Sequence, residues 1–176
     1  MPMGPIVVHA HYIPPGFLEA VGREPARYGV GLERASDGRM RFLFPGQDGT
    51  RPIPPGLLDL EQRVKALDAA GIRHQVVATW MDAVGYALPA EQGARWSRGY
   101  NESLAEALRA TAAPGRFSGA ATVPLQDGAR AAAELVHAVQ ALGLGAVQVG
   151  TNVLGRNLDE AGLDPFGKRR RRCGCP

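Results

Sequence analysis

The residues best suited to chemistry are two histidines near the start of the chain, His9 and His11, which a single alanine separates. They follow the apolar run 6–8, which is typical of a buried strand. Because side chains two apart on a strand lie on the same face, both imidazoles should project the same way. Neutral imidazole is a ligand for divalent transition metals. The pair therefore predicts part of a metal site; the alternative is a chance His-x-His run on an exposed edge strand.

The rest of the chain shows how such a pair could be positioned. Apolar strands are expected at 6–9, 74–80, 117–123 and 145–151, and amphipathic helices at 57–67, 89–112 and 128–142. This alternation predicts an α/β fold with a parallel sheet and right-handed crossovers. About four β/α units are present, which is half of a (β/α)8 TIM barrel, so we expect a partial barrel. Barrel active sites lie at the carboxyl ends of the strands, where His9 and His11 would stand.

A long segment separates the first strand from its helix. Residues 22–55 are rich in glycine, proline and charge, and Asp37-Gly38 predicts a hairpin turn. Excursions of this length usually shape a site or a subunit contact. Arg41 in this segment could meet a substrate carboxylate, but its register does not allow an assignment.

The carboxyl-terminal tail differs from the rest in composition. Of the 20 Lys and Arg residues, five lie at 168–172; without them 15 basic residues face 17 acidic ones, and the net charge changes from +3 to −2. Both cysteines, Cys173 and Cys175, also lie there, so the remainder holds no disulfide framework. The tail could be a basic nucleic-acid or targeting patch, a Cys-x-Cys metal or disulfide motif, or the product of a reading-frame slip.

We favour the reading-frame slip. Back-translation with GC-rich codons, and one T restored after Phe166, turns the tail into an alanine-rich helix that runs into a strand, as the preceding pattern predicts. The expected organisation is therefore an N-terminal half barrel at 1–166 and a frameshifted, non-native tail at 167–176. No apolar stretch approaches a membrane span and no signal peptide is evident, so we expect a soluble, cytoplasmic protein.

Six short segments carry a family resemblance: VHAHYIPP at 8–15, LDAAGI at 67–72, YNE at 100–102, PGRF at 114–117, ATVPLQ at 121–126 and LGLGAVQVGTNV at 142–153. Gly155 and Leu158-Asp159 extend the last one. Together they resemble the amidohydrolase-related proteins (amidohydrolase family 2), in particular the branch similar to aminocarboxymuconate-semialdehyde decarboxylase. The similarity covers nearly all of residues 6–166, which corresponds to the N-terminal half of such proteins.

This resemblance implies a metal-dependent decarboxylase (carboxy-lyase) or hydrolase that acts on a small carboxylic acid. In such relatives the His-x-His pair, here His9 and His11, binds a divalent metal, usually zinc, which activates water and polarises the substrate. Later strands supply the remaining ligands. The sequence departs from the family at Val7, where an acidic residue often stands, and it contains no fifth strand. No catalytic or substrate-binding residue is assigned.

Two functional hypotheses follow. In the first, the lineage is enzymatic, but this chain is truncated and inactive because a catalytic zinc normally has three protein ligands. Its substrate would be a small-molecule carboxylic acid, and the open sheet could pair with further copies of the chain. We expect it to bind neither nucleic acid nor a membrane. In the second, the chain is a non-catalytic fragment whose basic tail binds nucleic acid or a partner. We expect a structural or surface position for His74 and a packing or solvent-facing one for His137. Asn101 and Arg116 should fix loop geometry, and Trp80 should have a core or rim position.

Overall fold

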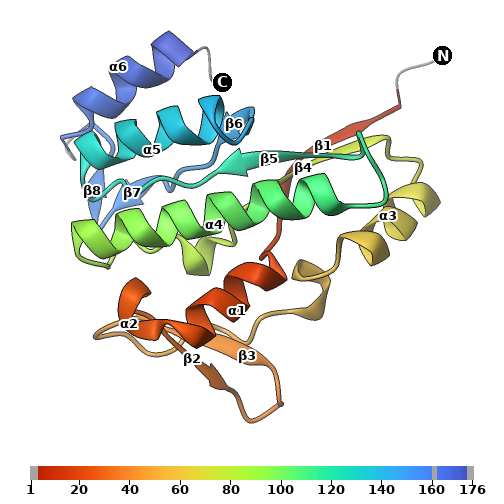
Figure 1. Ribbon diagram of the computed structural model, residues 1–176, viewed down its shortest axis with the longest axis horizontal. Coiled ribbons are helices and arrows are strands. Elements are labelled where there is room, and N and C mark those ends of the chain that lie inside the picture. The colour runs from red at the N-terminus through yellow and green to blue at the C-terminus, as the bar shows by residue number, and fades with distance from the viewer. Residues whose placement is uncertain (1–3, 160–161, 174–176) are drawn as a thin grey trace.

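The computed structural model describes residues 4–159 and 162–173. Its central sheet consists of four parallel strands in the order β1-β4-β5-β6. These strands are β1 (Ile6–His11), β4 (His74–Ala78), β5 (Phe117–Ala121) and β6 (Ala146–Val147). The helices that follow them are α3 (Leu60–Ala69), α4 (Ala90–Ala110), α5 (Gly128–Gln140) and α6 (Asp164–Cys173). Four β/α units curl into half of a (β/α)8 barrel, which confirms the predicted fold class (Figure 1).

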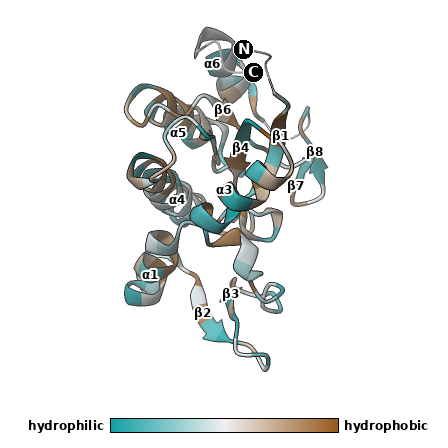
Figure 2. Cartoon of the chain, turned by 90° about the vertical axis from the view of Figure 1, so that its right-hand side faces the viewer, coloured by the Kyte–Doolittle hydropathy of each residue, from teal (hydrophilic) through white to brown (hydrophobic). Residues whose placement is uncertain are grey.

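Among the described residues, helices cover one face of this sheet and leave the other uncovered. Val77 and Gly119 are in register and share that face, and Val77 is fully buried. A Cβ at Gly119 would lie 3.1 Å from the Leu104 side chain, so α4 packs directly against β5. On the opposite face Ile6 is 49% exposed, and Val8, in the same strand, is 75% exposed. Figure 2 shows α4 and α5 on one side of β1 and β4, so the face that lines the inside of a barrel is open.

The long segment after β1 folds into a small subdomain. It contains α1 (Pro15–Arg23), α2 (Pro25–Tyr28), the antiparallel hairpin of β2 (Gly31–Arg34) and β3 (Met40–Leu43), and the 3-10 turn η1 (Pro55–Leu57). The hairpin turns at Asp37-Gly38, as predicted, with Gly38 at φ 83°. The Asp37 carboxylate accepts a hydrogen bond from the Arg39 amide, 3.0 Å, which closes the turn.

Trp96 on α4 joins this subdomain to the barrel. It is fully buried, and its indole nitrogen donates to the Ala83 carbonyl oxygen, 2.8 Å. The centroid of its ring lies 4.7 Å from that of Phe17, 5.1 Å from that of Phe42 and 5.2 Å from that of Phe44. Edge-to-face contacts between aromatic rings add to the energy of burial. Trp96 therefore holds α1 and the hairpin against α4.

The remaining elements are short. The 3-10 turn η2 (Met81–Ala83) follows β4, and the two-residue strands β7 (Asn152–Val153) and β8 (Arg156–Asn157) form a tight hairpin after β6. Helix α6 packs along α5 and includes residues 167–173 of the tail; residues 174–176 lie outside the described part of the chain. In the described residues no helix combines the length and apolarity needed to cross a membrane.

A buried polar network locks α4 to the end of β5. The Asn101 side-chain amide donates to the Thr122 carbonyl oxygen and to the Glu134 carboxylate, both at 2.8 Å, and its oxygen accepts from the Thr122 amide at 2.9 Å. Burial raises the pKa of Glu134, while Asn101 and Arg98 oppose that rise by hydrogen bonding. This is the structural role predicted for Asn101.

Substitution of Asn101 should therefore destabilise the fold. Asn101→Ala leaves the Thr122 amide and carbonyl and one Glu134 oxygen without these partners, and we expect the free energy of unfolding to fall by about 2–3 kcal/mol. Urea denaturation followed by circular dichroism measures the change. Glu106→Ala, on the exposed face of the same helix, is the matched control and should change stability by less than about 0.5 kcal/mol. Equal effects of the two substitutions would contradict this role.

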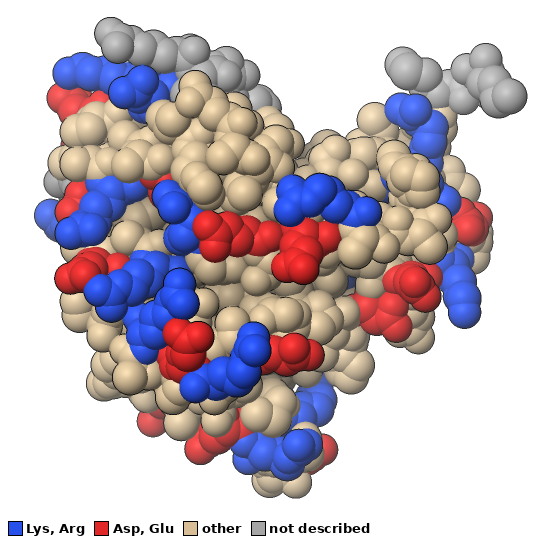
Figure 3. Space-filling model, in the orientation of Figure 1, with Lys and Arg blue, Asp and Glu red and all other residues tan. Residues whose placement is uncertain are grey.

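Charges on the outer face of α4 and α5 are largely paired. Arg98 donates to the buried Glu134 at 2.8 Å, and Arg95 pairs with Glu91 one turn before it. In Figure 3 basic and acidic side chains are interleaved over this side of the molecule. The Arg95–Glu91 pair is exposed, and exposed pairs contribute little to stability.

Candidate functional site

A β-bulge places both histidines on the open face of the sheet. Val7 is in register with Gln75 and Ala10 with Val77, so Val8 and His9 together oppose a single residue of β4. His11 then pairs with Ala78 at the end of the strand. The ring centroids of His9 and His11 are 4.8 Å apart, and the rings meet edge to face at 77°. The two imidazoles predicted as metal ligands are therefore adjacent at the carboxyl end of β1.

One ring has a defined tautomer. His11 Nδ1 lies 2.8 Å from the carbonyl oxygen of Thr79, the residue that follows β4. A carbonyl only accepts, so Nδ1 must carry the proton, and the neutral ring keeps a lone pair on Nε2. Metal-binding histidines are commonly oriented in this way by a backbone carbonyl on the other nitrogen. His11 therefore has the hydrogen bonding of a ligand, with Nε2 as the donor atom.

Electrostatics also favours the neutral form of His11. Burial lowers its pKa below the ordinary value of 6.5; the nearby charges of His9 and Arg63 act in the same direction, and the Thr79 bond and Asp82 oppose it. Only a deprotonated imidazole nitrogen can bind a metal. The residues present thus fit a divalent metal in their chemistry.

A pH titration tests this shift in pKa. In the metal-free protein we expect the Cε1–H resonance of His11 to titrate below pH 6.5. Because the unfolded chain then takes up the proton first, the contribution of His11 to stability is present above pH 6.5 and is lost as the pH falls through the lower, folded value. NMR gives the pKa, and His11→Gln should remove this part of the pH dependence of stability. A pKa at or above 6.5 would contradict the assignment.

Two side chains, the half-buried Arg63 and the buried Tyr100, fix the backbone that carries the histidines. The Arg63 guanidinium of α3 donates to the His11 carbonyl oxygen at 2.8 Å and to the Gly56 carbonyl oxygen at 2.7 Å. The Tyr100 hydroxyl of α4 donates to the Tyr12 carbonyl oxygen at 2.9 Å. Burial raises the pKa of Tyr12 to about 12 and also raises the pKa of Tyr100, so both hydroxyls stay neutral at physiological pH.

An arginine that sequence reasoning did not identify stands at the same end of the sheet. Arg51 donates twice to the Asp82 carboxylate, at 2.8 Å in both bonds, and its guanidinium lies 5.4 Å from the centroid of the Trp80 ring. The Arg51 side chain is 75% exposed. Arg41, which we considered for substrate binding, instead pairs with Glu33 across the β2–β3 hairpin. No local sequence signal distinguishes Arg51, because its position depends on how the excursion folds back.

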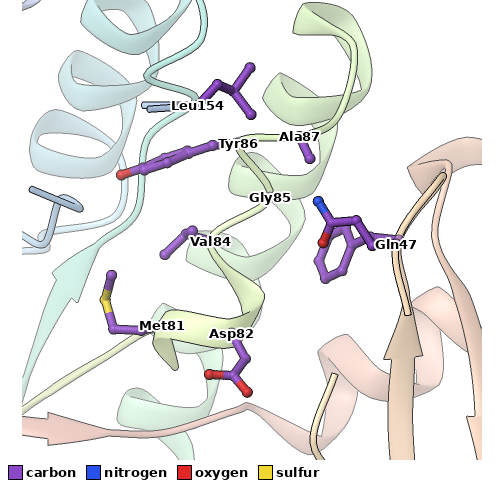
Figure 4. Close-up of a pocket in the computed structure, with 9 residues that line it drawn as sticks. Gln47, Met81, Asp82, Val84, Gly85, Tyr86, Ala87 and Leu154 are labelled. Atoms are coloured by element: carbon purple, nitrogen blue, oxygen red, sulfur yellow. The ribbon is translucent and has the colours of Figure 1, made fainter. Parts of the chain in front are cut away.

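A pocket, here called the rim pocket, adjoins Asp82. Its volume is about 280 Å³, and it lies between the loop after β4, the segment after β3 and the β7–β8 turn. Figure 4 shows Leu154 beside Tyr86 at one end of the pocket and Asp82 at the other. Its lining residues are Phe44, Gln47, Met81, Asp82, Val84, Gly85, Tyr86, Ala87 and Leu154. Met81 and Asp82 lie just after β4, whose last residue, Ala78, pairs with His11, so the pocket and the imidazole pair lie at the same end of the sheet.

The other residues considered from sequence have structural positions. His74 contacts the Gly115 carbonyl oxygen at 2.9 Å and the Ser118 hydroxyl at 2.8 Å, at the opposite end of the strands. His137 lies on α5, 3.6 Å from Glu102. Trp80 is 5% exposed within the main core.

Arg116 also has a structural position, and no third ligating side chain joins the histidines in the described residues. Arg116 donates to the Arg73 and Ile72 carbonyl oxygens and to Asp68, and so fixes the loops at the amino ends of the strands. Among the residues that the structure describes, no group of three or more His, Cys, Asp or Glu side chains could hold a metal. Within this part of the chain, His9 and His11 are thus a pair without a third such side chain beside them.

Comparisons with known structures define the class of fold. The chain matches a 5-carboxyvanillate decarboxylase from Sphingomonas paucimobilis with a TM-score of 0.73 and 20% identity, over 98% of this chain and 50% of that one. It also matches a dihydroxybenzoic acid decarboxylase from a Polaromonas species, whose structure contains manganese and the inhibitor 2-nitroresorcinol. The TM-score is 0.68 and the identity 22%, over 98% of this chain and 48% of that one. The fold is thus half of the type of barrel that these decarboxylases form.

The sequence comparison finds a relative in the branch that the sequence resembles. The chain is 26% identical over 163 residues to 2-amino-3-carboxymuconate-6-semialdehyde decarboxylase of Dictyostelium discoideum. The aligned region covers 92% of this chain and 44% of that protein. No family model matches. The resemblance to the aminocarboxymuconate-semialdehyde decarboxylase branch of the amidohydrolase-related proteins is confirmed. The chain spans about half the length of the relatives it matches.

Proposed function

We propose that this chain forms the metal-binding N-terminal half of a decarboxylase that acts on a small carboxylic acid. The observation that carries the proposal is the arrangement of His9 and His11: two adjacent imidazoles at the carboxyl end of a barrel strand, with the Thr79 carbonyl leaving Nε2 of His11 free. The decarboxylase relatives support carboxy-lyase chemistry over hydrolysis.

In this proposal His9 and His11 hold a divalent metal. A bound metal would supply Lewis-acid chemistry, which polarises the substrate and lowers the pKa of water. Zinc suits imidazole ligands and is our first choice, and manganese is the ion named with the Polaromonas relative. The Thr79 carbonyl orients His11, and Arg63 holds the backbone beneath it.

Arg51 is the proposed contact for the substrate carboxylate. A guanidinium binds a carboxylate through two parallel hydrogen bonds, as Arg51 already does with Asp82. The exposure of its side chain leaves it free to exchange that partner for a substrate at the same end of the sheet. The ring of Trp80 beneath it restricts where the guanidinium can move.

The proposal also includes where the half barrel ends in the sequence and what this chain can do by itself. We place its boundary at residue 166 and interpret residues 167–176 as frameshifted sequence. Two imidazoles fall short of the three protein ligands of a catalytic zinc site, so we expect the 176-residue chain by itself to be inactive. Genomic sequence across the Phe166–Gly167 junction in an independent isolate decides the reading frame; the same frame in a full-length relative would refute the slip.

Carbon dioxide release from the restored full-length product tests the activity. The substrates to try are 5-carboxyvanillate, 2,6-dihydroxybenzoate and aminocarboxymuconate semialdehyde, with and without chelator. We expect release from at least one of them, lost on chelation and in the variant His9→Gln/His11→Gln. Activity that is indifferent to both treatments would defeat the proposal.

A further inference from the structure

The β7–β8 turn contains an unusual residue, Leu154. It has φ 52°, and it is the one non-glycine residue with positive φ in the described part of the chain. L-residues other than glycine, asparagine and aspartate rarely adopt this left-handed conformation, because Cβ approaches the following carbonyl oxygen. Gly155 follows with φ 80°, so both central positions of the hairpin turn are left-handed. Asn-Gly is the pair that such turns prefer, and here leucine occupies the asparagine position.

The turn itself is firmly held. Val153, the preceding residue, is fully buried in a hydrophobic cluster with Tyr86 and Leu125, and the Asn152 side-chain oxygen accepts from the Gly155 amide at 3.2 Å. The Gly150 amide donates to the Tyr86 hydroxyl at 3.0 Å, which ties the segment before β7 to the wall of the rim pocket. These contacts explain how the chain tolerates a strained residue at 154.

Burial within the chain does not explain why the residue is leucine. Leu154 is 63% exposed, one of five large hydrophobic side chains exposed among the described residues. Met81, another of the five, is 38% exposed, and both line the rim pocket. An unfavourable conformation that presents an apolar side chain to solvent beside a pocket is the combination expected where a ligand supplies the missing contact.

The walls of the rim pocket indicate the chemistry of that ligand. Apolar groups of Phe44, Met81, Val84, Tyr86 and Leu154 surround the space, which suits a flat apolar ring. At one end Asp82 offers carboxylate oxygens that can accept from a ring hydroxyl, and its partner Arg51 can meet a carboxylate. A hydroxy-aromatic carboxylic acid matches these features together.

We propose that the rim pocket is the ring-binding subsite of the proposed decarboxylase, and that Leu154 is a specificity-determining residue held in a strained turn in order to cover the ring. The inference rests on the proposed function, since the rim pocket follows β4 at the same, carboxyl end of the sheet as the imidazole pair. It adds where the substrate ring binds. It also implies that the strained turn at Leu154 lowers the stability of the free chain and that ligand binding offsets this loss. Leu154 touches the apolar ring and takes no part in bond breaking.

The test is the substitution Leu154→Asn. We expect it to raise the stability of the chain and to weaken ligand binding. Asparagine suits the left-handed turn, so the melting temperature should rise by about 2–4 °C. Loss of the leucine contact should weaken 4-hydroxybenzoate binding, measured by isothermal titration calorimetry with manganese present, by about tenfold. Leu158→Asn is the matched control: it changes a 36% exposed leucine outside the rim pocket, and should produce neither effect.

The outcomes separate this inference from the proposed function. Failure of the wild-type chain to bind 4-hydroxybenzoate, unchanged affinity in Leu154→Asn, or a lower melting temperature would each overturn the inference. Acetate, which has no ring, should bind equally to the wild type and the variant; equal weakening of acetate would also overturn it. If Leu154→Asn behaves as expected while His9 and His11 bind no metal, the subsite stands and the proposed function falls.

Discussion

Replacement of both histidines, His9→Gln/His11→Gln, is expected to lower the affinity of the chain for Zn²⁺ by about a hundredfold or more. Loss of residues that merely orient a metal ligand commonly costs 10–100-fold, and this variant removes the ligands themselves. Glutamine retains much of the side-chain volume and a polar end, so the β1 strand and its bulge should persist. Competition titration with a chromophoric chelator measures the affinity.

The chain provides two matched controls for this experiment. His74→Gln and His137→Gln change the other two of its four histidines, which lie away from the carboxyl end of β1. Both variants should bind Zn²⁺ as the unmodified chain does. A comparable loss of affinity in either control, or an unchanged affinity in the double variant, would refute the assignment of His9 and His11.

Removal of the indole at Trp96 is expected to have the largest effect on stability. Trp96→Ala should lower the free energy of unfolding by about 3–5 kcal/mol, the range for deletion of a buried large aromatic side chain. The substitution removes the contacts with Phe17, Phe42 and Phe44 together with the hydrogen bond to the Ala83 carbonyl oxygen. Urea denaturation measures the loss.

A conservative variant separates the two contributions of Trp96. Trp96→Phe keeps an aromatic ring in the cluster but loses the indole N–H, so its cost should be clearly smaller than that of Trp96→Ala. If Trp96→Ala lowers the free energy of unfolding by less than about 1 kcal/mol, the surrounding side chains have filled the space left by the indole. That result would contradict the view that Trp96 joins the subdomain to the barrel.

The fold was largely predictable from sequence, because each β/α unit has a local signature. Apolar runs at 74–80 and 117–123 predicted β4 and β5, and glycine or proline marked the ends of the intervening helices. The last strand was less predictable: an expected strand at 145–151 is two residues of β6 followed by the β7–β8 hairpin. Its length depends on pairing with β5, which periodicity along the chain does not report.

The site was only partly predictable. The His-x-His spacing identified the two candidate ligands, but simple alternation does not describe their geometry, because the bulge at Val8 and His9 sets it. The Thr79 carbonyl lies 68 positions from His11, and Arg51 lies 31 positions from Asp82. Such partners are determined by tertiary packing and leave no mark in local composition. The strain at Leu154 likewise appears only in the backbone angles.

The most direct test of the central claim is paramagnetic broadening of the histidine side chains by Mn²⁺. The chain has four histidines, so one long-range imidazole NMR spectrum follows all of them as the ion is added. If the pair at the end of β1 binds the metal, the resonances of His9 and His11 broaden together at the lowest Mn²⁺ concentrations, while those of His74 and His137 stay sharp. Broadening that begins at His74 or His137, or that affects all four alike, would contradict it.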